Sequence, residues 1–496
     1  MNTSSSRTLP LALAVVLVPG LYLLITSAFF PLSFLPVFDA KRVLQLIMFV
    51  VLLLIALMYA PLRQATITQL ACTPRSIGYA LTLFFGLGIL SSLRLSHPGY
   101  ALLDVSNLFV ILLLVFVVAA GRNLSKSLFD QWAVSILAIM GFAVAVQEVT
   151  GFVAGWMTGI EFSYEHVLIH FASPRFYNQL QTWSIPLLAA LPWLFPRRPW
   201  IKPVSISLLG LQWFLVLSTG ARGTTLSLVT AMVVIGLWLP GSRRFWMRLQ
   251  LSGVITGCIL YALVMILNGA LIEKPGDFYV SSVGRPMLHT SGRSMLWGLS
   301  VEDAVRNPLL GAGPGRYACQ RHPMLPAHPH SFPFRILGEW GFVALFLLLY
   351  LGFRLGVRFL VRIKRYYRDV AGDGGTDDPS DNPLRALLAI SVLAGVMHAC
   401  LSGLLIMPAS QVALLLIAGW TASMNTQPRP GYGHYPLARL VLLGGLVLAT
   451  TQAVYAIQEI PRLPERTGYT EGTGPLFPRF WWVGKVCDYH YPDDKS

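Results

Sequence analysis

The residues best suited to chemistry are basic side chains that stand between long apolar runs. Arg222 lies in a very short turn between two such runs. An arginine near membrane depth costs on the order of 2.5 kcal/mol or more unless it is paired, hydrated or able to reach the interface. Its planar guanidinium suits bidentate contact with phosphate oxygens. The alternative is an arginine that only anchors a helix end, and the residue alone does not decide between the two.

A second set of basic residues lies in the hydrophilic stretch between about residues 268 and 333. It comprises Arg285, His289, Arg293, Arg306, Arg316, Arg321, His322, His328 and His330. The acidic residues set against them are Glu273, Asp277, Glu302 and Asp303. This balance suits a ligand that carries phosphate. The alternative is a long loop without a function.

His330 is a candidate general base, because the pKa of a histidine lies near neutrality. A lone histidine is more often structural, and the neighbouring His328 is an equally open choice. Glu339 lies about one and a half to two turns into the next helix if that helix starts near Pro333. There it either orients a histidine or pairs with Arg335 at i, i+4.

The composition around these residues is that of a membrane protein. The chain has 496 residues, of which 55% are hydrophobic and 12% charged, whereas soluble domains carry about 25% charged residues. Backbone groups in lipid must be paired internally, so long apolar runs predict helices. We therefore expect an all-α polytopic integral membrane protein. The net charge of +15 fits cytoplasmic loops better than nucleic-acid binding, and the five cysteines show no metal-ligand spacing.

The apolar runs predict about 12–13 transmembrane helices of roughly 20 residues each. The N-terminal run is expected to be a retained helix, because it is long for a signal peptide and lacks a small-residue cleavage site. The predicted spans lie at about residues 9–30, 43–61, 77–93, 103–121, 131–153, 182–196, 203–219, 224–240, 250–269, 333–352, 385–407, 410–424 and 438–457.

The loops predict the orientation of these helices. With a cytoplasmic N-terminus, the inner loops hold most of the lysines and arginines, as the positive-inside rule requires. Polar stretches around Arg175, Arg222, Arg293 and His330 then face the same, outer side. The predicted parts are N-terminal helices 1–181 with a periplasmic segment 154–181, central helices 182–269, a large periplasmic loop 270–333, C-terminal helices 334–457 with a disordered cytoplasmic linker 369–385, and a polar tail 458–496.

Four motifs in this order resemble the O-antigen ligase superfamily, which also holds O-antigen polymerases and protein O-oligosaccharyltransferases. Arg222-Gly-Thr-Thr-Leu226 matches Arg-x3-Leu, and His330 with Gly341 matches His-x10-Gly. Ser-Gly-Arg-x3-Trp and Pro-Leu-Leu-Gly-x-Gly-Pro-Gly lie between them. The resemblance covers about residues 170–410, and within the superfamily the chain is most like an O-antigen ligase. The motifs are specific for the superfamily but weak for any one of its three activities.

The resemblance implies a GT-C-like, metal-independent glycosyltransferase of the bacterial inner membrane, with its active site facing the periplasm and no cofactor. It would move a glycan from undecaprenyl diphosphate to an acceptor hydroxyl. Arg222 and Arg293 would bind the donor diphosphate and His330 would act as the base. Fixed guanidinium groups would stabilise the charge that develops on the leaving diphosphate. Arg175 is a further candidate for the diphosphate, and the candidates for support are Gln179, His328, Glu339 and Arg316.

The three activities of this superfamily differ in the molecule that accepts the glycan. The leading expectation is ligation of O-antigen to lipid A-core in lipopolysaccharide biosynthesis; the alternatives are transfer to a protein such as a pilin, and O-antigen polymerisation. The stretch Arg175-Phe-Tyr-Asn-Gln179 departs from the Gly- and Pro-Asn-containing pattern of many ligases, which weakens that expectation. A polysaccharide transporter or flippase is the alternative of another class, but the two halves show no matching broken helices.

Overall fold

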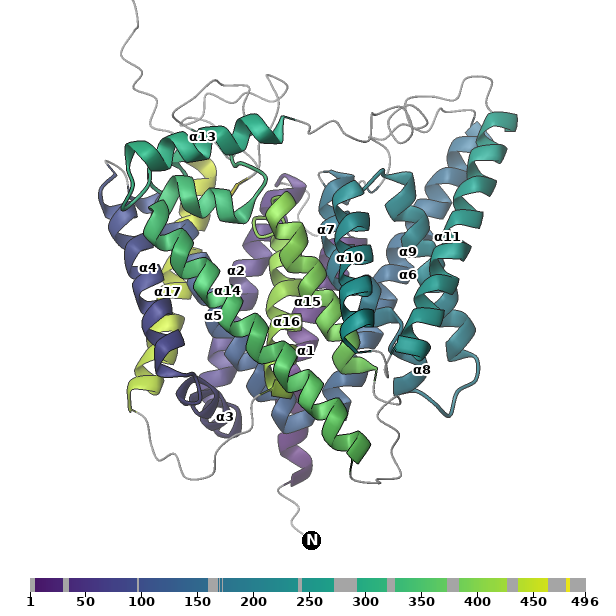
Figure 1. Ribbon diagram of the computed structural model, residues 1–496, viewed down its shortest axis with the longest axis horizontal. Coiled ribbons are helices and arrows are strands. Elements are labelled where there is room, and N and C mark those ends of the chain that lie inside the picture. Colours follow the sequence, from purple (N-terminus) through teal and green to yellow (C-terminus); the bar gives the residue numbers. More distant parts are fainter. Residues whose placement is uncertain are drawn as a thin grey trace, which may run out of the picture.

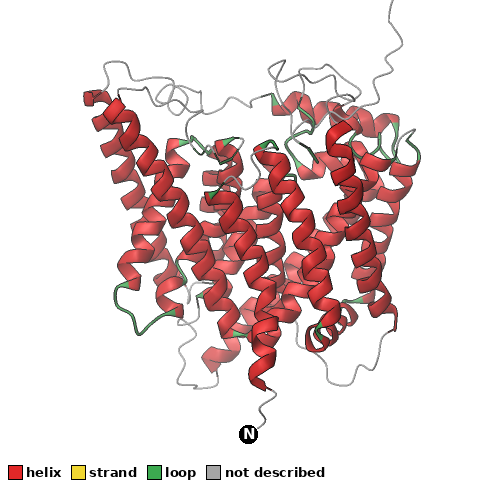
Figure 2. Ribbon diagram, turned by 180° about the vertical axis from the view of Figure 1, so that it is seen from behind, coloured by secondary structure: helices red, strands yellow, loops and turns green. Residues whose placement is uncertain are grey.

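The computed structural model describes residues 5–29, 35–95, 98–158, 168, 170–171, 173–239, 243–271, 292–318, 326–372, 383–425, 436–462 and 479–481. These residues form helices joined by turns and loops, and none of them is in a strand (Figure 2). The predicted all-α polytopic membrane fold is confirmed. Arg285, His289, Arg321 and His322 of the large loop lie outside the described residues.

The long helices stand side by side, with α13 at the end opposite to the chain's N-terminus (Figure 1). Their bounds are α1 (Ser5–Ala28), α2 (Val37–Met58), α3 (Ala60–Ala71), α4 (Arg75–Leu93), α5 (Gly99–Ser125), α6 (Ser127–Thr158), α7 (Pro174–Leu188), α8 (Leu191–Leu194), α9 (Ile201–Ser218), α10 (Arg222–Trp238), α11 (Arg243–Leu271), α13 (Arg293–Arg306), α14 (Phe332–Gly372), α15 (Leu384–Leu401), α16 (Pro408–Asn425) and α17 (Pro436–Glu459). Two 3-10 helices are η2 (Arg316–Ala318) and η4 (Ile460–Arg462).

Ten helices of the described chain are long and apolar enough to cross a membrane, and α10 and α16 are shorter apolar helices. The run predicted at 182–196 differs most from its expectation. Its helix, α7, begins at Pro174 and ends at Leu188, two residues after the internal Pro186. The first half of α7 buries amide side chains such as Gln179 and Gln181. Because these buried side chains are polar, the hydropathy of the sequence does not indicate where this helix begins.

Small residues let the central helices approach closely, as is common in membrane proteins. On the facing sides of α9 and α11, a Cβ at Gly210 would lie 2.5 Å from Thr256, and a Cβ at Gly257 would lie 2.6 Å from Trp213. A Cβ at Gly395 on α15 would lie 2.0 Å from the Trp183 ring of α7. At these positions α9 packs on α11, and α15 packs on α7, without room for a larger side chain.

Both ends of the predicted linker 369–385 are helical. The helix α14 continues to Gly372 and α15 begins at Leu384, so residues of both helices fall within the predicted linker. Residues 373–382 lie outside the described part of the chain. The basic residues between Arg354 and Arg368 lie in the C-terminal half of α14, where charged side chains lower the hydropathy without ending the helix.

Three residues of the polar tail, Arg479, Phe480 and Trp481, are buried in the protein. The sequence predicts a polar tail at 458–496, and no periodic apolar pattern there marks a core element. The rest of the tail after residue 462 lies outside the described residues.

Candidate active site

Four of the predicted site residues come together from four separate elements. Arg175 lies in the first turn of α7, Arg222 and Arg293 begin α10 and α13, and His330 lies just before α14. Burial and then the positive charges of Arg175 and Arg222 lower the pKa of Arg293. Burial and then Arg293 and Arg175 lower the pKa of His330 from 6.5 to about 4. The structure thus places a neutral histidine beside concentrated positive charge.

Such a cluster is suited to an anion. Like charges raise each other's free energy, and an ion of opposite charge among them removes that cost. Guanidinium groups also match the geometry of phosphate oxygens. Within the described residues, no group of three or more His, Cys, Asp or Glu side chains is placed to hold a metal ion. The cluster of Arg175, Arg222 and Arg293 beside His330 is suited to an anion that carries phosphate.

Arg222 is placed by a tight turn between α9 and α10. Gly220 adopts a φ of 58°, a conformation that glycine reaches without steric cost. The Ala221 N–H donates to the Val216 carbonyl at 3.1 Å, and the Arg222 N–H donates to the Gly220 carbonyl at 2.9 Å. The turn leaves Arg222 exposed at the N-terminus of α10, where the helix dipole adds positive potential.

Arg293 is placed by the start of α13, and the same helix contacts the histidine loop, which we define as residues 326–331. Gly292 precedes the helix with a φ of 73°. One turn later the Trp297 indole N–H donates to the Pro329 carbonyl at 3.1 Å, and its ring stacks on Phe334 at 4.9 Å between centroids. The Ser-Gly-Arg-x3-Trp motif therefore positions both an arginine and the loop that carries His330.

The two histidines of this loop have different surroundings. The His330 backbone N–H donates to Nδ1 of His328 at 3.1 Å, so the neutral His328 ring carries its proton on Nε2. His328 is only 3% exposed, and a Cβ on Gly403 would lie 2.4 Å from its Cε1. Burial, followed by electrostatic interactions with His330, Arg479 and Arg335, holds the pKa of His328 well below its usual range. His328 thus shapes the loop, while His330 lies beside the arginines.

His330 itself adopts a φ of 52°, which is uncommon for a residue with a Cβ. A conformation of this kind costs on the order of 1–3 kcal/mol and persists only where the surroundings impose it. Two hydrogen bonds hold it here: the Trp297 indole N–H donates to the preceding Pro329 carbonyl, and the His330 N–H donates to the His328 ring. The loop is therefore held in a strained form at the residue predicted to act as the base.

The helix α14 is broken at Gly341, which has φ 87° and ψ −179°. The break leaves carbonyls of the preceding turn without their helical partners. The Gly338 carbonyl accepts from the Ala312 N–H at 2.8 Å, and the Glu339 carbonyl accepts from the Gly313 N–H at 3.0 Å. The Pro-Leu-Leu-Gly-x-Gly-Pro-Gly motif therefore supplies the hydrogen bonds that the broken helix lacks.

The same loop approaches Gly341 too closely for any side chain. The Phe342 N–H donates to the Pro308 carbonyl at 2.9 Å. A Cβ on Gly341 would lie 2.7 Å from the carbonyl carbon and oxygen of Leu309. The glycine of the His-x10-Gly motif and the glycine-rich motif thus form one structural unit behind His330.

The candidates for support are placed differently. The sequence left two roles open for Glu339, orienting a histidine or pairing with Arg335. In the structure Glu339 pairs with Arg335 at 3.4 Å and also with Arg479 at 2.6 Å. The Gln179 amide donates to the Ser402 hydroxyl at 3.0 Å. Arg316 is exposed in η2 and is not among the groups that lower the pKa of His330.

The sequence did not single out His398, which lies next to the Arg222 turn. A Cβ on Gly223 would lie 3.0 Å from the His398 Nε2, and the Nδ1 atom is 2.7 Å from the Thr182 hydroxyl. His398 stands inside an apolar run of α15. Its position in a predicted span was the available signal, because ionisable residues there are often functional.

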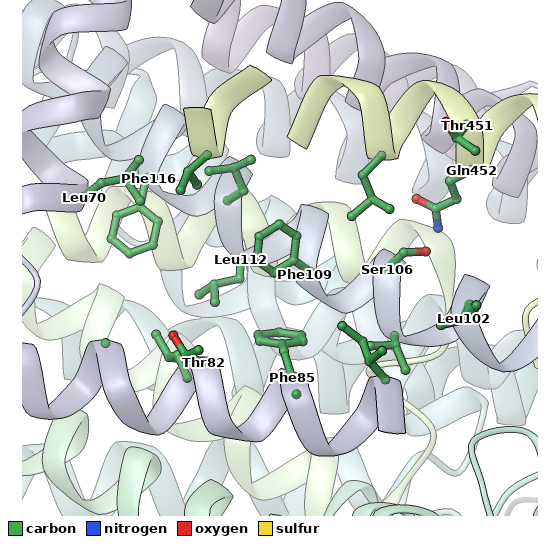
Figure 3. Close-up of a pocket in the computed structure, with 18 of the residues that line it drawn as sticks. Leu70, Thr82, Phe85, Leu102, Ser106, Phe109, Leu112, Phe116, Thr451 and Gln452 are labelled. Atoms are coloured by element: carbon green, nitrogen blue, oxygen red, sulfur yellow. The ribbon is translucent and has the colours of Figure 1, made fainter. Parts of the chain in front are cut away.

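A large apolar groove, about 1010 Å³ in volume, lies elsewhere, between α3, α4, α5 and α17 (Figure 3). Phe85, Phe109, Leu112 and Phe116 are among its lining side chains (Figure 3). None of the described residues that line it is charged, and none is a predicted site residue. The basic cluster is therefore distinct from this groove.

The fold and the cluster define a polytopic all-α membrane protein with a basic, histidine-containing site on the side opposite to its N-terminus (Figure 1). Residues 206–349 match the model of the O-antigen ligase family. This segment holds Arg222, Arg293 and His330, and the match confirms the resemblance to the O-antigen ligase/polymerase superfamily. It supports glycosyl transfer of that general type. A comparison with curated proteins gives no match.

Replacing Arg175 with glutamine is expected to raise the pKa of His330 from about 4 towards 6.5, because one of the charges that lower it is removed. NMR titration of histidine-labelled protein in detergent would measure this change. The pKa of His330 is lower in the folded protein than in the unfolded chain, so protonation of this residue opposes folding. The contribution of His330 to the free energy of unfolding is therefore complete above about pH 6.5 and is lost as the pH falls from about 6.5 through about 4.

Arg306→Gln is the matched control for this titration. Arg306 lies on α13, and its side chain is 68% exposed in an i, i+4 pair with Glu302. Its loss should leave the His330 titration in place. Equal shifts in the two variants, or none in Arg175→Gln, would contradict the electrostatic link between α7 and His330.

Proposed function

We propose that the protein transfers a glycan from an undecaprenyl-diphosphate carrier to an acceptor hydroxyl at the periplasmic face of the bacterial inner membrane. The observation that carries this proposal is the gathering of four residues from four separate elements: Arg175 and Arg293 act on His330, and Arg222 acts on Arg293. The family match of residues 206–349 supports it.

In this reaction the bond between the sugar C1 and the diphosphate oxygen breaks, and a bond between C1 and the acceptor oxygen forms. The acceptor proton passes to His330, and the electron pair of the broken bond stays on the diphosphate. The guanidinium groups of Arg222 and Arg293 stabilise the negative charge that develops there. The scheme needs no metal ion, because the arginines supply the positive charge.

The low pKa of His330 fits a base that works only with donor bound. At a pKa of about 4 the histidine is neutral but weakly basic, whereas an efficient base has a pKa nearer the working pH. A bound diphosphate offsets the charges of Arg293 and Arg175, which raises the pKa of His330. Donor binding therefore prepares the histidine to accept the acceptor's proton.

Among acceptors, lipid A-core is the one we favour, because the matching family is described as O-antigen ligase. The product would be O-antigen joined to lipopolysaccharide. Reconstituted protein would be given undecaprenyl-diphosphate-linked glycan with either O-antigen-free lipopolysaccharide or pilin, and the products resolved by mass. Glycan on lipid A-core establishes ligation. Glycan on pilin, or a longer lipid-linked chain, assigns a sister activity, while the absence of any product contradicts the proposal.

Replacing Arg222 with alanine is expected to lower the transfer rate by about 10²- to 10³-fold, the usual cost of losing one group that stabilises a developing anion. The measurement is single-turnover transfer together with donor binding. Arg306→Ala is the control, because this exposed arginine of α13 pairs with Glu302 at i, i+4. Wild-type turnover by correctly inserted Arg222→Ala protein would contradict the role of this arginine.

A further inference from the structure

A buried cluster of four charged side chains lies behind the histidine loop. Asp104 of α5 pairs with Arg335 of α14 at 3.0 Å and with Arg479 at 2.8 Å. Glu339 pairs with the same two arginines, at 3.4 Å and 2.6 Å. All four residues are buried. Two cations and two anions balance, which is the condition under which buried charges are tolerated.

Arg479 differs from the other members because it also reaches the histidine loop. Its Nη1 atom donates to the Ala327 carbonyl at 3.0 Å and to Glu339 at 2.6 Å. Its Nε and Nη2 atoms donate to Asp104 at 2.9 Å and 2.8 Å. One guanidinium therefore joins α5, α14 and the residue that precedes His328.

The segment that carries Arg479 is itself held by a buried arginine, Arg42 of α2. Its Nε atom donates to the Phe480 carbonyl at 3.0 Å. Its Nη2 atom donates to the Ile406 carbonyl at 2.6 Å, in the turn that also contains Gly403, against which His328 packs. Arg479 thus joins residues 479–481 to Ala327 of the histidine loop, and Arg42 joins them to the 403–406 turn against which His328 packs.

We propose that Arg479 is a positioning residue of the site. It holds the histidine loop in its strained form, so that His330 stays beside Arg175 and Arg293, and it does not touch the substrate. The position of the loop follows from the contacts of Arg479, while its importance for transfer rests on the proposed function. Lysine cannot replace it, because an ammonium group lacks the planar fork that reaches three partners together.

The test is the reactivity of individual histidines towards diethyl pyrocarbonate, followed peptide by peptide by mass spectrometry in the full-length protein. Three variants are compared: Arg479→Lys, Arg479→Gln, and the charge-balanced Arg479→Gln/Glu339→Gln. Arg306→Gln is the control from an exposed ion pair. His398 is the internal reference, because it is buried on α15 and its Nδ1 atom lies 2.7 Å from the Thr182 hydroxyl of α7, whereas Arg479 bonds to Asp104, Glu339 and Ala327.

We expect His328 and His330 to react about tenfold faster or more in all three variants, since each loses hydrogen bonds made by a charged group. His398 should react at the wild-type rate, and donor affinity should persist because Arg175, Arg222 and Arg293 remain. The charge-balanced variant separates positioning from the cost of an unpaired buried charge. Wild-type reactivity of His328 and His330 in that variant and in Arg479→Lys would overturn the proposal.

A common increase at every histidine, His398 included, would also overturn it, because Arg479 would then only stabilise the whole fold. Glycan transfer is measured on the same samples. If the wild-type protein transfers no glycan, the proposed function fails, while the labelling still reports whether Arg479 positions the loop. If the wild type transfers glycan, the variants should lose turnover with donor affinity retained.

Discussion

Replacing His330 with alanine is expected to lower the rate of glycan transfer by roughly 10²- to 10⁴-fold, the range that a positioned general base contributes. The donor should still bind, because the arginines that surround His330 would carry the diphosphate. Single-turnover transfer and donor affinity, measured on the same reconstituted protein, would separate the two effects. The expected signature is a loss of rate with an unchanged dissociation constant.

His328→Ala is the informative companion to this variant. The His328 ring accepts the His330 N–H and packs on Gly403, so its loss should loosen the loop and lower thermal stability as well as rate. His330→Ala should leave stability nearly unchanged. Full activity of His330→Ala together with a large loss in a well-folded His328→Ala protein would show that His328 is the base.

Replacing Gly341 with alanine is expected to destabilise the protein by about 3 kcal/mol or more, combining backbone strain at positive φ with overpacking. Its φ of 87° and the 2.7 Å distance from a Cβ to the Leu309 carbonyl leave no room for a methyl group. The loop that pairs with α14 must move, and with it the turn that carries Glu339. Thermal unfolding in detergent would measure the loss.

Gly352→Ala on the same helix is the control. Nothing lies within 4 Å of a Cβ at Gly352, and alanine is favoured over glycine in a helix by about 0.5–1 kcal/mol. This variant should be as stable as the wild type or slightly more so. Equal unfolding temperatures for the two variants would show that the break at Gly341 does not need glycine.

Much of the architecture follows from composition and periodicity. The apolar runs predict the helices and their approximate ends, because an apolar run of about 20 residues has few other stable forms in lipid. The prediction fails at α7, where Asn178, Gln179 and Gln181 lower the hydropathy. Those amides are buried against neighbouring helices, as in the pairing of Asn178 and Gln181 at 2.8 Å. A hydropathy pattern does not distinguish a polar face buried in protein from a loop.

Part of the candidate site could also be predicted from the types of its residues. Arg222, Arg293 and His330 stand out because cations near apolar runs are costly and imidazole suits proton transfer. Their presence on one side follows from the alternation of spans. That they lie close enough to lower the pKa of His330 to about 4 follows only from the structure.

The contacts that bring His398 and Arg479 to the site lay beyond sequence reasoning for a physical reason. An apolar run specifies that a helix is in the membrane, but its partners are selected by side-chain shape and charge across contacts between distant parts of the chain. His398 meets the Arg222 turn because Gly223 leaves space for its ring. Arg479 meets the histidine loop because Asp104 and Glu339 stabilise its buried charge.

The amino-acid sequence by itself determined a helical membrane protein and predicted that its candidate arginines and histidines lie on one side, because burial of apolar runs and the asymmetry of charged loops are local properties of the chain. The tertiary structure decided which of these residues share a site and which histidine lies beside the arginines. Those outcomes depend on hydrogen bonds and close contacts between elements that are distant in the chain, such as Trp297 with Pro329 and Gly341 with Leu309.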